Sequence, residues 1–265
     1  MNEARAPIVM VFAGHDPCGG AGIQADIETL TSLGCHPCTV ITALTAQDTS
    51  GVKDFQPVQA TFLVEQARAV LEDMPVAAFK IGMTASQDII EAIHTLLQDY
   101  ADIPVVFDPV LAAGGGGSLA REHLIEAFHD LLIPCASIIT PNTVEAKALC
   151  SDADSLDACA QQLMAQGAEY VLITGGHEAT PKIENRLWGH RQFLESYQQE
   201  RTPGEFHGTG CTLASSIAGY LAHGATMPSA VRDAQTYTAK AVAHGRRLGM
   251  GQLIPDRLSW SSKHL

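Results

Sequence analysis

Positive charge is scarce in this sequence. Its 265 residues include 16 lysines and arginines against 29 aspartates and glutamates, which gives a formal net charge of −13. Because such a surface repels the phosphates of nucleic acids and anionic lipids, we expect neither a nucleic acid nor a membrane as a partner. A site for a small phosphate compound must then use local features: a helix N-terminus, loop N–H groups or a metal ion.

Long apolar runs and a disulfide framework are also lacking. The longest apolar runs are only as long as a β-strand, so we expect no membrane span. Residues 1–7 contain no basic stretch followed by an apolar one, so we expect no signal peptide. The 7 cysteines show no regular spacing, which fits a reducing cytoplasm. Cys35 and Cys38 form a C-x-x-C pair that leads into a predicted strand, and we interpret them as buried thiols rather than a zinc or redox site.

Short apolar strands alternate with amphipathic helices along the chain. The predicted strands cover residues 8–13, 40–44, 78–82, 105–107, 137–140 and 170–174. This alternation predicts a single α/β domain over residues 1–265, with a largely parallel sheet between two layers of helices. Residues 185–189 and 192–197 alternate around a short turn and predict a small β-hairpin. Residues 45–51, after the second strand, are interpreted as a polar tip that can contact a heterocycle.

The segment FHGTGCT at residues 206–212 leads into a helix. Leu213, Ile217 and Leu221 recur every four residues and predict one buried face. Gly224 is placed to end the helix in a left-handed cap.

The start of this helix is a natural site for an anion. Its first N–H groups have no partner within the helix, and the helix dipole is positive at this end. Gly208 and Gly210 allow a tight loop and the close approach of a phosphate. Cys211 lies in the first turn, where we expect the pKa of its thiol to be lowered. An ordinary loop–helix junction with a buried, inert cysteine is the alternative.

A second glycine-rich loop, GHDPCGGAG at residues 14–22, joins the first strand to a helix. Many α/β proteins bind a small ligand at this position, the carboxyl end of a strand. The loop matches neither the dinucleotide fingerprint nor the Walker phosphate loop. Asp26 lies one turn into the helix, and we favour a ligand-facing carboxylate over a solvated surface residue. Met83 follows the third strand and is either core filler or a soft lid on a flat ring.

Carboxylates follow two later strands. Asp108 comes directly after residues 105–107, in the crevice where α/β proteins bind ligands and metals. Asn142 and Glu145 lie at the start of the helix that follows the strand at residues 137–140, and they have the spacing of a capping box. The same pair could instead serve a metal ion, and the sequence leaves both interpretations open.

Taken together, the motifs resemble one known family. Residues 13–26 read AGHDPCGGAGIQAD against the family's AGSDPSGGAGIQAD, and residues 206–213 resemble its THGTGCTL. The segments VITALTAQ, KIGM, DPV, ITPN and GGH occur between them in the expected order. The chain thus resembles the hydroxymethylpyrimidine/phosphomethylpyrimidine kinases of thiamine synthesis, which belong to the ribokinase-like superfamily. The resemblance implies a three-layer α/β/α fold, often a homodimer, that uses ATP and Mg²⁺.

The resemblance also implies roles for individual residues. It assigns the pyrimidine to Gly14, Asp26, Gln47, Met83 and Val110; the anion hole to Gly208, Thr209 and Gly210, with Cys211 as the catalytic base; Mg²⁺ to Asp108 and Glu145; and the nucleotide to Asn142, Thr174 and Gly176. In the first step Cys211 would take the proton of the hydroxymethyl group. In the second step the acceptor is already an anionic phosphate, so a base has little to do.

A few positions depart from the family pattern. His15 and Cys18 stand where serine is usual, and Gly114 and Thr174 stand where lysine is common. The missing lysines remove positive charge that steadies phosphate groups, so we expect the second phosphorylation to be the step most affected. Pyridoxal kinase is the closest rival activity, and a non-catalytic pyrimidine- or nucleotide-binding regulator is the alternative from a different class.

Overall fold

A central β-sheet organises the protein, whose computed structural model describes residues 6–111, 118–176 and 180–260. The strands are β1 (Ile8–His15), β2 (His36–Asp48), β3 (Gly51–Pro57), β4 (Val76–Ile81), β5 (Val105–Phe107), β6 (Ile138–Ile139), β7 (Tyr170–Ile173), β8 (Lys182–Gly189) and β9 (Gln192–Glu200). Their order across the sheet is β3-β2-β1-β4-β5-β6-β7-β8-β9. The strands from β2 to β7 in this order are parallel, and β3, β8 and β9 extend the two edges in antiparallel fashion.

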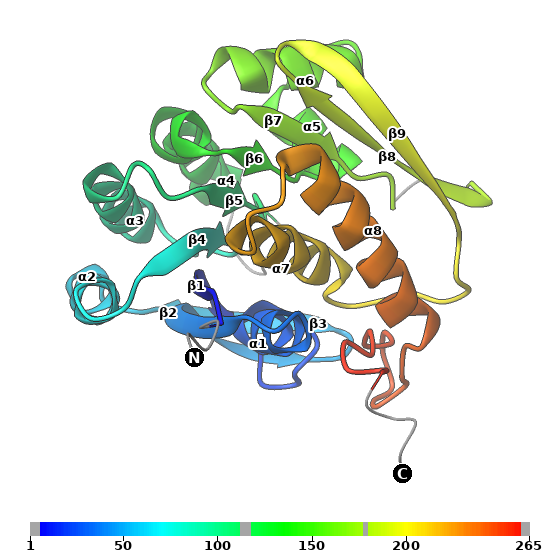
Figure 1. The fold of residues 1–265 in the computed structure, drawn as a ribbon, viewed down its shortest axis with the longest axis horizontal. Helices are drawn as coiled ribbons and strands as arrows, with labels where there is room; N and C mark the ends of the chain where they lie inside the picture. The colour runs from blue at the N-terminus through cyan, green and yellow to red at the C-terminus, as the bar shows by residue number, and fades with distance from the viewer. Residues whose placement is uncertain (1–5, 112–117, 177–179, 261–265) are drawn as a thin grey trace, which may run out of the picture.

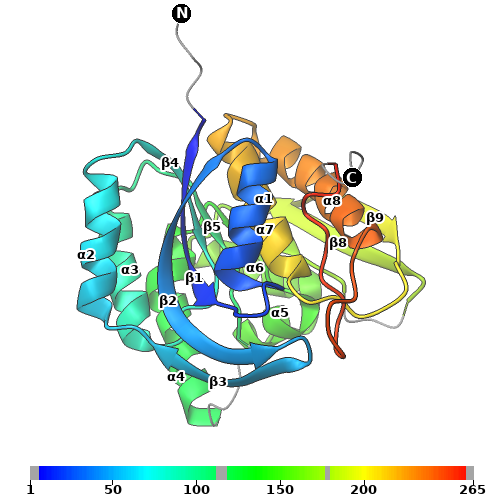
Figure 2. The same ribbon diagram turned by 90° about the horizontal axis from the view of Figure 1, so that it is seen from below.

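Helices cover both faces of the sheet (Figures 1 and 2). They are α1 (Gly22–Ser32), α2 (Ala60–Leu71), α3 (Gln87–Asp99), α4 (Ser118–Ala127), α5 (Thr143–Leu149), α6 (Leu156–Ala165), α7 (Thr209–Ala222) and α8 (Met227–Ala243). Helices α1, α7 and α8 pack on one face, and α2 to α6 pack on the other. The predicted three-layer α/β/α architecture with a largely parallel sheet is therefore confirmed.

Strand β1 shows why its sequence is apolar throughout. Met10 and Phe12 point into the core beneath α2 and α3, whereas Val9 and Val11 point into the core beneath α1 and α7. Because successive side chains of a strand point to opposite faces, a strand covered on both sides favours apolar residues at every position.

The predicted hairpin and the end of α7 are confirmed. Strands β8 and β9 pair around a turn at His190 and Arg191, whose φ angles of 52° and 60° are both left-handed. Positive φ at both central residues is typical of the tight hairpin turn that matches strand twist. Gly224 follows α7 with φ 85°, as expected of a left-handed cap.

One predicted strand boundary was wrong. The second strand does not end before residues 45–51: β2 continues to Asp48, and the chain returns at once as β3. Asp48 Oδ1 accepts the Ser50 N–H at 2.8 Å, which closes the turn between these strands. The last helix ends at Ala243, and the segment after it pairs with another part of the chain, with a bridge between Arg246 and Ile254.

The described helices include none that is both long and apolar enough to cross a membrane. The segment after α8 instead lies against the turn of the β2–β3 hairpin, where the Gln252 N–H donates to the Thr49 carbonyl at 2.8 Å. It then reaches α1, where Trp260 Nε1 donates to Ser32 Oγ at 2.8 Å (red in Figure 2). The C-terminal segment therefore braces both β2 and α1.

Candidate active site

The carboxyl ends of the parallel strands gather most of the predicted site residues at one edge of the sheet. Gly14 lies near the end of β1 and Gln47 near the end of β2. The other predicted site residues follow a strand closely. Asp108 and Thr174 come directly after β5 and β7, and Met83, Val110 and Asn142 lie two or three positions after β4, β5 and β6. Since parallel strands end on the same side, the topology alone brings these positions to a common edge.

The two glycine-rich loops touch each other at this edge. Gly208 has φ 85°, and a Cβ built on it would lie 1.8 Å from the Gly20 carbonyl oxygen. A Cβ on Gly20 would in turn lie 2.3 Å from the His207 ring. A side chain at Gly208 would therefore force the backbone to move, and one at Gly20 would force the His207 ring to move. Gly20 and Gly208 are almost 190 positions apart in the sequence, and the lack of a side chain at each lets the two loops pack against each other. This role is independent of any ligand.

Arg257 fastens this contact from the side. Its guanidinium is 1% exposed. Its Nε donates to Thr212 Oγ1 at 2.9 Å in the first turn of α7, and its terminal nitrogens donate to the carbonyls of Gly19 and Gly20. Glu28 on α1 pairs with the same guanidinium at 3.0 Å. A buried charge is tolerated only with such partners, so Arg257 fixes the β1–α1 loop relative to α7.

The N-terminus of α7 faces Asp108. Gly208 precedes the helix and supplies no side chain to cap its first turn. A Cβ on Gly210 would lie 3.8 Å from Asp108 Oδ2, so the carboxylate stands beside the predicted anion hole. Gly208, Thr209 and Gly210 therefore lie where the helix dipole, positive at this end, can act on an anion near Asp108.

A buried ion pair lies behind the anion hole. Lys80 on β4 and Asp26 on α1 are both 0% exposed, and Lys80 Nζ lies 3.0 Å from Asp26 Oδ1 and 3.1 Å from Oδ2. Ser215 Oγ on α7 also donates to Asp26 Oδ1, at 2.5 Å. Asp26 is predicted to contact the pyrimidine, and without a ligand its carboxylate has no exposed surface and is held by Lys80 and Ser215.

The expectation of a lowered pKa for the Cys211 thiol is wrong. Burial, with the negative charges of Asp108 and Asp26, raises this pKa to about 11 against the opposing charge of Lys80. The helix N-terminus does not outweigh these effects, so the thiol is protonated at neutral pH in the ligand-free protein. Burial likewise raises the pKa of Asp108 to about 6, although Lys80 acts in the opposite direction.

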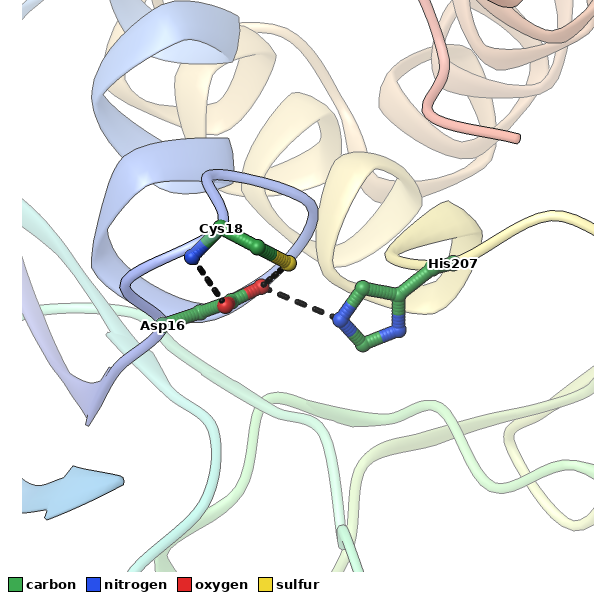
Figure 3. A group of neighbouring side chains, drawn as sticks. All are labelled: Asp16, Cys18 and His207. Carbon is green, nitrogen blue, oxygen red and sulfur yellow. Dashed lines mark hydrogen bonds and ion pairs between the residues drawn. The ribbon is translucent and has the colours of Figure 1, made fainter. Parts of the chain in front are cut away.

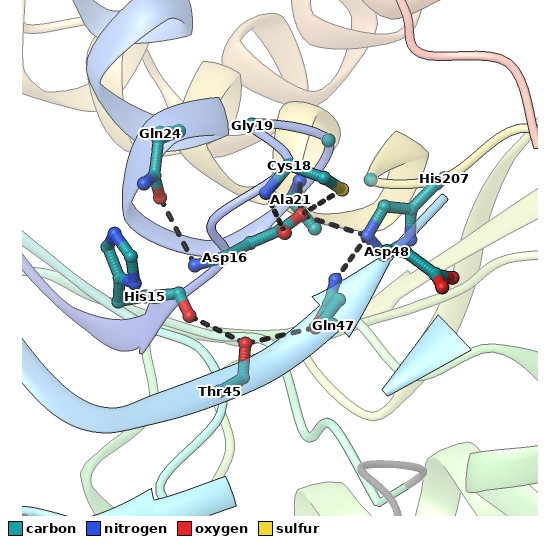
Figure 4. A network of polar contacts seen from close by, with 12 residues as sticks. His15, Asp16, Cys18, Gly19, Ala21, Gln24, Thr45, Gln47, Asp48 and His207 are labelled. Atoms are coloured by element: carbon teal, nitrogen blue, oxygen red, sulfur yellow. Dashed lines mark hydrogen bonds and ion pairs between the residues drawn. The ribbon is translucent and has the colours of Figure 1, made fainter. Parts of the chain in front are cut away.

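A polar network spans the other side of the loop contact (Figure 4). Asp16 is 2% exposed, and its Oδ2 accepts from the Ala21 N–H at 2.8 Å and from His207 Nε2 at 3.0 Å. Although burial opposes ionisation, hydrogen bonds from His207, Cys18 and Ala21 hold the pKa of Asp16 well below its usual range.

Gln47 joins this network from β2. Its side-chain amide lies 2.6 Å from His207 Nε2 and 3.4 Å from Thr45 Oγ1, and Thr45 Oγ1 donates to the His15 carbonyl at 2.8 Å. If the amide oxygen faces the imidazole and the amide nitrogen faces Thr45, each of these hydrogen bonds joins a donor to an acceptor. Hydrogen bonding therefore selects this orientation. The same amide is the group predicted to contact the pyrimidine.

Gly14 and Met83 are brought together as the predicted ring site requires. A Cβ on Gly14 would lie 3.1 Å from Met83 Sδ, so the thioether covers the bare glycine. Met83 is anchored by its own carbonyl, which accepts a hydrogen bond from Thr42 Oγ1 at 2.5 Å. Val110 is partly buried beside Asp108, whose carbonyl accepts the Val110 N–H at 2.9 Å.

The predicted nucleotide side is built mainly from backbone. Asn142 caps α5 by accepting the Val144 and Glu145 N–H groups, and Glu145 Oε2 accepts the Asn142 N–H at 2.9 Å, so the capping box is present. Thr174 bridges to Asn142, and its carbonyl accepts the Thr143 N–H at 3.1 Å. Gly176 is exposed. Gly114, where lysine is common in the family, lies outside the described residues.

A comparison with protein families assigns this arrangement. The model described as "Phosphomethylpyrimidine kinase" matches residues 16–256, a range that contains the loop before α7 and all but the first two residues of the loop after β1. The chain belongs to the phosphomethylpyrimidine kinase family. The resemblance seen in the sequence is thus confirmed.

Relatives of this kinase family member cover nearly all of it. The hydroxymethylpyrimidine/phosphomethylpyrimidine kinase of Haemophilus influenzae is 37% identical over 252 residues, which are 92% of this chain and 93% of that one. The thiamine biosynthesis bifunctional protein ThiED of Geobacter sulfurreducens is 39% identical over 255 residues, which are 93% of this chain. Those residues are 52% of the bifunctional protein, so this chain spans about half its length.

A solved structure shows the same fold. An ADP complex of Bacillus subtilis pyridoxal kinase matches with a TM-score of 0.87 and 28% identity, over 97% of this chain and 99% of that one. The fold is therefore shared between kinases named for two different vitamin precursors. Which precursor a family member takes must depend on side chains at the ligand site rather than on the fold.

Four polar residues of this kinase were not predicted to build the site: Asp16, Lys80, His207 and Arg257. Lys80 did carry a signal, because a lysine inside an apolar central strand must find a buried partner. Asp16 and His207 stand within the two motifs, but no pattern in the sequence connects them across 191 positions. Arg257 follows the last helix and matches no motif used in the sequence analysis.

Proposed function

We propose that this kinase transfers the γ-phosphoryl group of ATP to the hydroxymethyl group of 4-amino-5-hydroxymethyl-2-methylpyrimidine, and then a second one to the resulting monophosphate, in thiamine synthesis. The observation that carries the proposal is the direct contact between the Gly14–Gly22 loop and the loop that ends at Gly208. This contact brings the loop beside which the ring would lie next to the helix N-terminus that would bind an anion. The names of the relatives support both acceptors.

The pyrimidine would lie between β1, β2 and β4. Met83 supplies a polarisable face for the ring, and Gly14 lets the ring approach the backbone of β1. The Gln47 amide offers a hydrogen-bonding group at the rim, and Val110 closes the site from β5. Gln47 and Asp26 would read the polar edge of the ring, and the buried carboxylate of Asp26 would have to become accessible to the ligand.

Phosphoryl transfer mainly requires alignment and charge stabilisation. Gly208, Thr209 and Gly210 at the start of α7 would receive the negative charge that develops on the transferred group. Cys211, in the same turn, would accept the proton of the hydroxymethyl group. Its thiol is protonated before substrate binds, so it would first have to release this proton to solvent, and the buried ammonium of Lys80 favours the resulting thiolate.

The carboxylates present fit Mg²⁺. Asp108 and Glu145 supply hard oxygen ligands after neighbouring strands. Burial raises the pKa of Asp108 to about 6, and a cation beside its carboxyl group would favour the ionised form. When bound with ATP, Mg²⁺ neutralises phosphate charge. Asn142, Thr174 and Gly176 would contact the nucleotide. A homodimer in the cytoplasm belongs to the same proposal.

Pyridoxal kinase is a second candidate because a pyridoxal kinase shares this fold over almost the whole chain. A ring site made of a thioether, a glycine and one amide can accept a pyridine alcohol as well as a pyrimidine. A non-catalytic regulator is a third candidate, favoured by the absence of lysine at Gly114 and Thr174.

ADP release separates the three. Purified protein with saturating MgATP should form ADP with the hydroxymethylpyrimidine, and turnover with pyridoxal should be far slower. Binding of the pyrimidine without ADP formation would show a regulator. Faster turnover of pyridoxal would assign the second candidate instead.

A further inference from the structure

Three side chains with metal-binding atoms converge at the mouth of the loop contact (Figure 3). They are Asp16 and Cys18 from the β1–α1 loop and His207 from the loop before α7. One ligand atom of each lies within 4.8 Å of the other two. The function proposed above uses none of the three, and Cys18 stands where the family has serine.

The spacing suits tetrahedral coordination. Asp16 Oδ2 lies 3.4 Å from Cys18 Sγ and 3.0 Å from His207 Nε2. Ligand atoms around a tetrahedral Zn²⁺ are roughly 3.3–3.7 Å apart, as follows from bond lengths of about 2.0–2.3 Å. The two distances from Asp16 are thus within a few tenths of an ångström of this range, and the ligand atoms of Cys18 and His207 lie within 4.8 Å of each other.

The charges also suit a cation. The Asp16 carboxylate is ionised, because its hydrogen bonds hold its pKa well below the usual range. Burial and the neighbouring carboxylate of Asp16 raise the pKa of the Cys18 thiol to about 11, and the charge of Asp48 adds to this effect. A divalent ion would displace the thiol proton to water, and the carboxylate and thiolate together would then balance its two charges.

Solvent reaches the cluster from one side. A cavity of about 350 Å³ is lined by Cys18 and Gln47, with the turn of the β2–β3 hairpin and Met250 around them. His207 keeps 20% of its side chain exposed, whereas Asp16 keeps 3%. An ion can thus enter at Cys18 and His207, and water from the cavity can fill a fourth coordination position.

The geometry points to a site for one thiophilic divalent cation of the Zn²⁺ class, formed by Asp16 Oδ2, Cys18 Sγ and His207 Nε2. His207 binds through Nε2 as the neutral imidazole, with its proton moved to Nδ1 through solvent. A sulfur and a nitrogen ligand select Zn²⁺ over Mg²⁺, which prefers oxygen ligands. The site is thus chemically distinct from the proposed magnesium site at Asp108.

An ion here would act on both glycine loops. It would tie the β1–α1 loop to His207, which directly precedes Gly208 and contacts the Gln47 amide. We therefore expect Zn²⁺ to inhibit turnover, an expectation that rests on the proposed function. Binding of the ion does not rest on it.

The binding test uses the full-length protein, stripped of metal and titrated with Zn²⁺ against a chromophoric chelator. The wild type should bind one Zn²⁺ per chain at this site. Cys18→Ser, which restores the usual family residue and keeps a hydrogen-bond donor for Asp16, should weaken binding at least about tenfold. Equal stoichiometry and affinity in the wild type and Cys18→Ser would overturn the proposal.

Cys135→Ser is the matched control. Cys135 is also partly exposed, and its Sγ lies 3.7 Å from His94 Nδ1, so it forms a cysteine–histidine pair without the buried carboxylate. This variant should bind Zn²⁺ as the wild type does. A loss in Cys135→Ser equal to that in Cys18→Ser would show nonspecific thiol binding and would likewise reject the site.

Co²⁺ provides a measurement that needs no variant for detection. Bound at this site, it should give a sulfur-to-cobalt charge-transfer band that is missing in Cys18→Ser, and its absence in the wild type would exclude Cys18 as a ligand. If the protein has kinase activity, Zn²⁺ should inhibit the wild type more strongly than Cys18→Ser. An inactive protein that still shows the Co²⁺ band would reject the kinase function and leave the metal site intact.

Discussion

The two sides of the active-site edge are built in different ways. Where β1, α1 and α7 meet, the contacts are buried: the Lys80–Asp26 pair, the Arg257 guanidinium and the glycine backbones leave no space for another side chain. At the ends of β6 and β7, Thr174 is only partly buried, Gly176 is exposed, and the contacts are mostly between backbone groups. The proposed substrate side is thus held by buried contacts, whereas the described residues of the proposed nucleotide side are held mainly by backbone hydrogen bonds.

The largest effect is expected from the base on the substrate side. Cys211→Ala should slow phosphorylation of the alcohol by about 10²–10⁴-fold, the usual contribution of a positioned base. Phosphorylation of the monophosphate should change much less, because that acceptor has no proton to lose. Cys211→Asp should retain more of the alcohol step than of the phosphate step, since its fixed charge repels an anionic acceptor. Rates of both steps in both variants test this, and equal losses would reduce Cys211 to a packing residue.

The pH dependence sharpens the same comparison. Because the Cys211 thiol has a pKa raised to about 11, its thiolate fraction increases as the pH rises towards that value. The alcohol step of the wild type should therefore accelerate between about pH 7 and pH 9, and the acceleration should be lost in Cys211→Ala. A wild-type rate that is flat over this interval would contradict the assignment.

The buried ion pair should dominate stability on this side. Lys80→Met leaves the Asp26 carboxylate buried with no counter-charge, so the free energy of unfolding should fall by about 3–5 kcal/mol. Replacing both partners, as in Lys80→Met with Asp26→Leu, should restore part of the loss, because no charge remains buried. Urea denaturation of the single and double variants measures the coupling. Additive losses would show that the two side chains act independently.

Gly208 tests the loop contact with an internal control. Gly208 and Gly224 both have φ 85°, but a Cβ on Gly208 meets the Gly20 carbonyl, whereas a Cβ on Gly224 has no atom within 4 Å. Gly224→Ala should cost about 1–2 kcal/mol from conformation alone. Gly208→Ala should cost about 2–5 kcal/mol and also reduce turnover, because the loops must separate. If both variants lose the same free energy of unfolding and turnover is unchanged, the close approach of Gly208 to the Gly20 carbonyl is not required.

The smallest effect is expected on the nucleotide side. Thr174→Lys adds a charge at a partly exposed position, where an ion pair contributes up to about 1 kcal/mol. It should lower the KM for ATP by up to about fivefold, with a greater gain in the phosphate step than in the alcohol step. Thr236→Lys, on the exposed face of α8, adds the same charge away from the site and should leave KM unchanged. A KM for ATP that rises in Thr174→Lys but not in Thr236→Lys would contradict the view that this side has room for a lysine.

Local patterns were sufficient for the elements that depend on local physics. The alternation of apolar strands and amphipathic helices, the capping box of Asn142 and Glu145 and the left-handed Gly224 all follow from short stretches of sequence. The β2–β3 hairpin was missed, although the turn residues from Asp48 to Gly51 carried its signal. A strand at the edge of a sheet has mostly polar residues, so its pattern is weaker than that of a central strand.

The sequence by itself determined the family, the parallel α/β fold and the edge of the sheet where ligands bind, because each depends on periodicity or on contiguous motifs. Only the tertiary structure decided what the charged residues do. Asp26 is fully buried as the partner of Lys80, and the thiol of Cys211 is protonated rather than ionised. Burial sets both results, since the cost of a buried charge depends on every group around it, and those groups come from β4, β5, α1 and α7, which are distant in the chain.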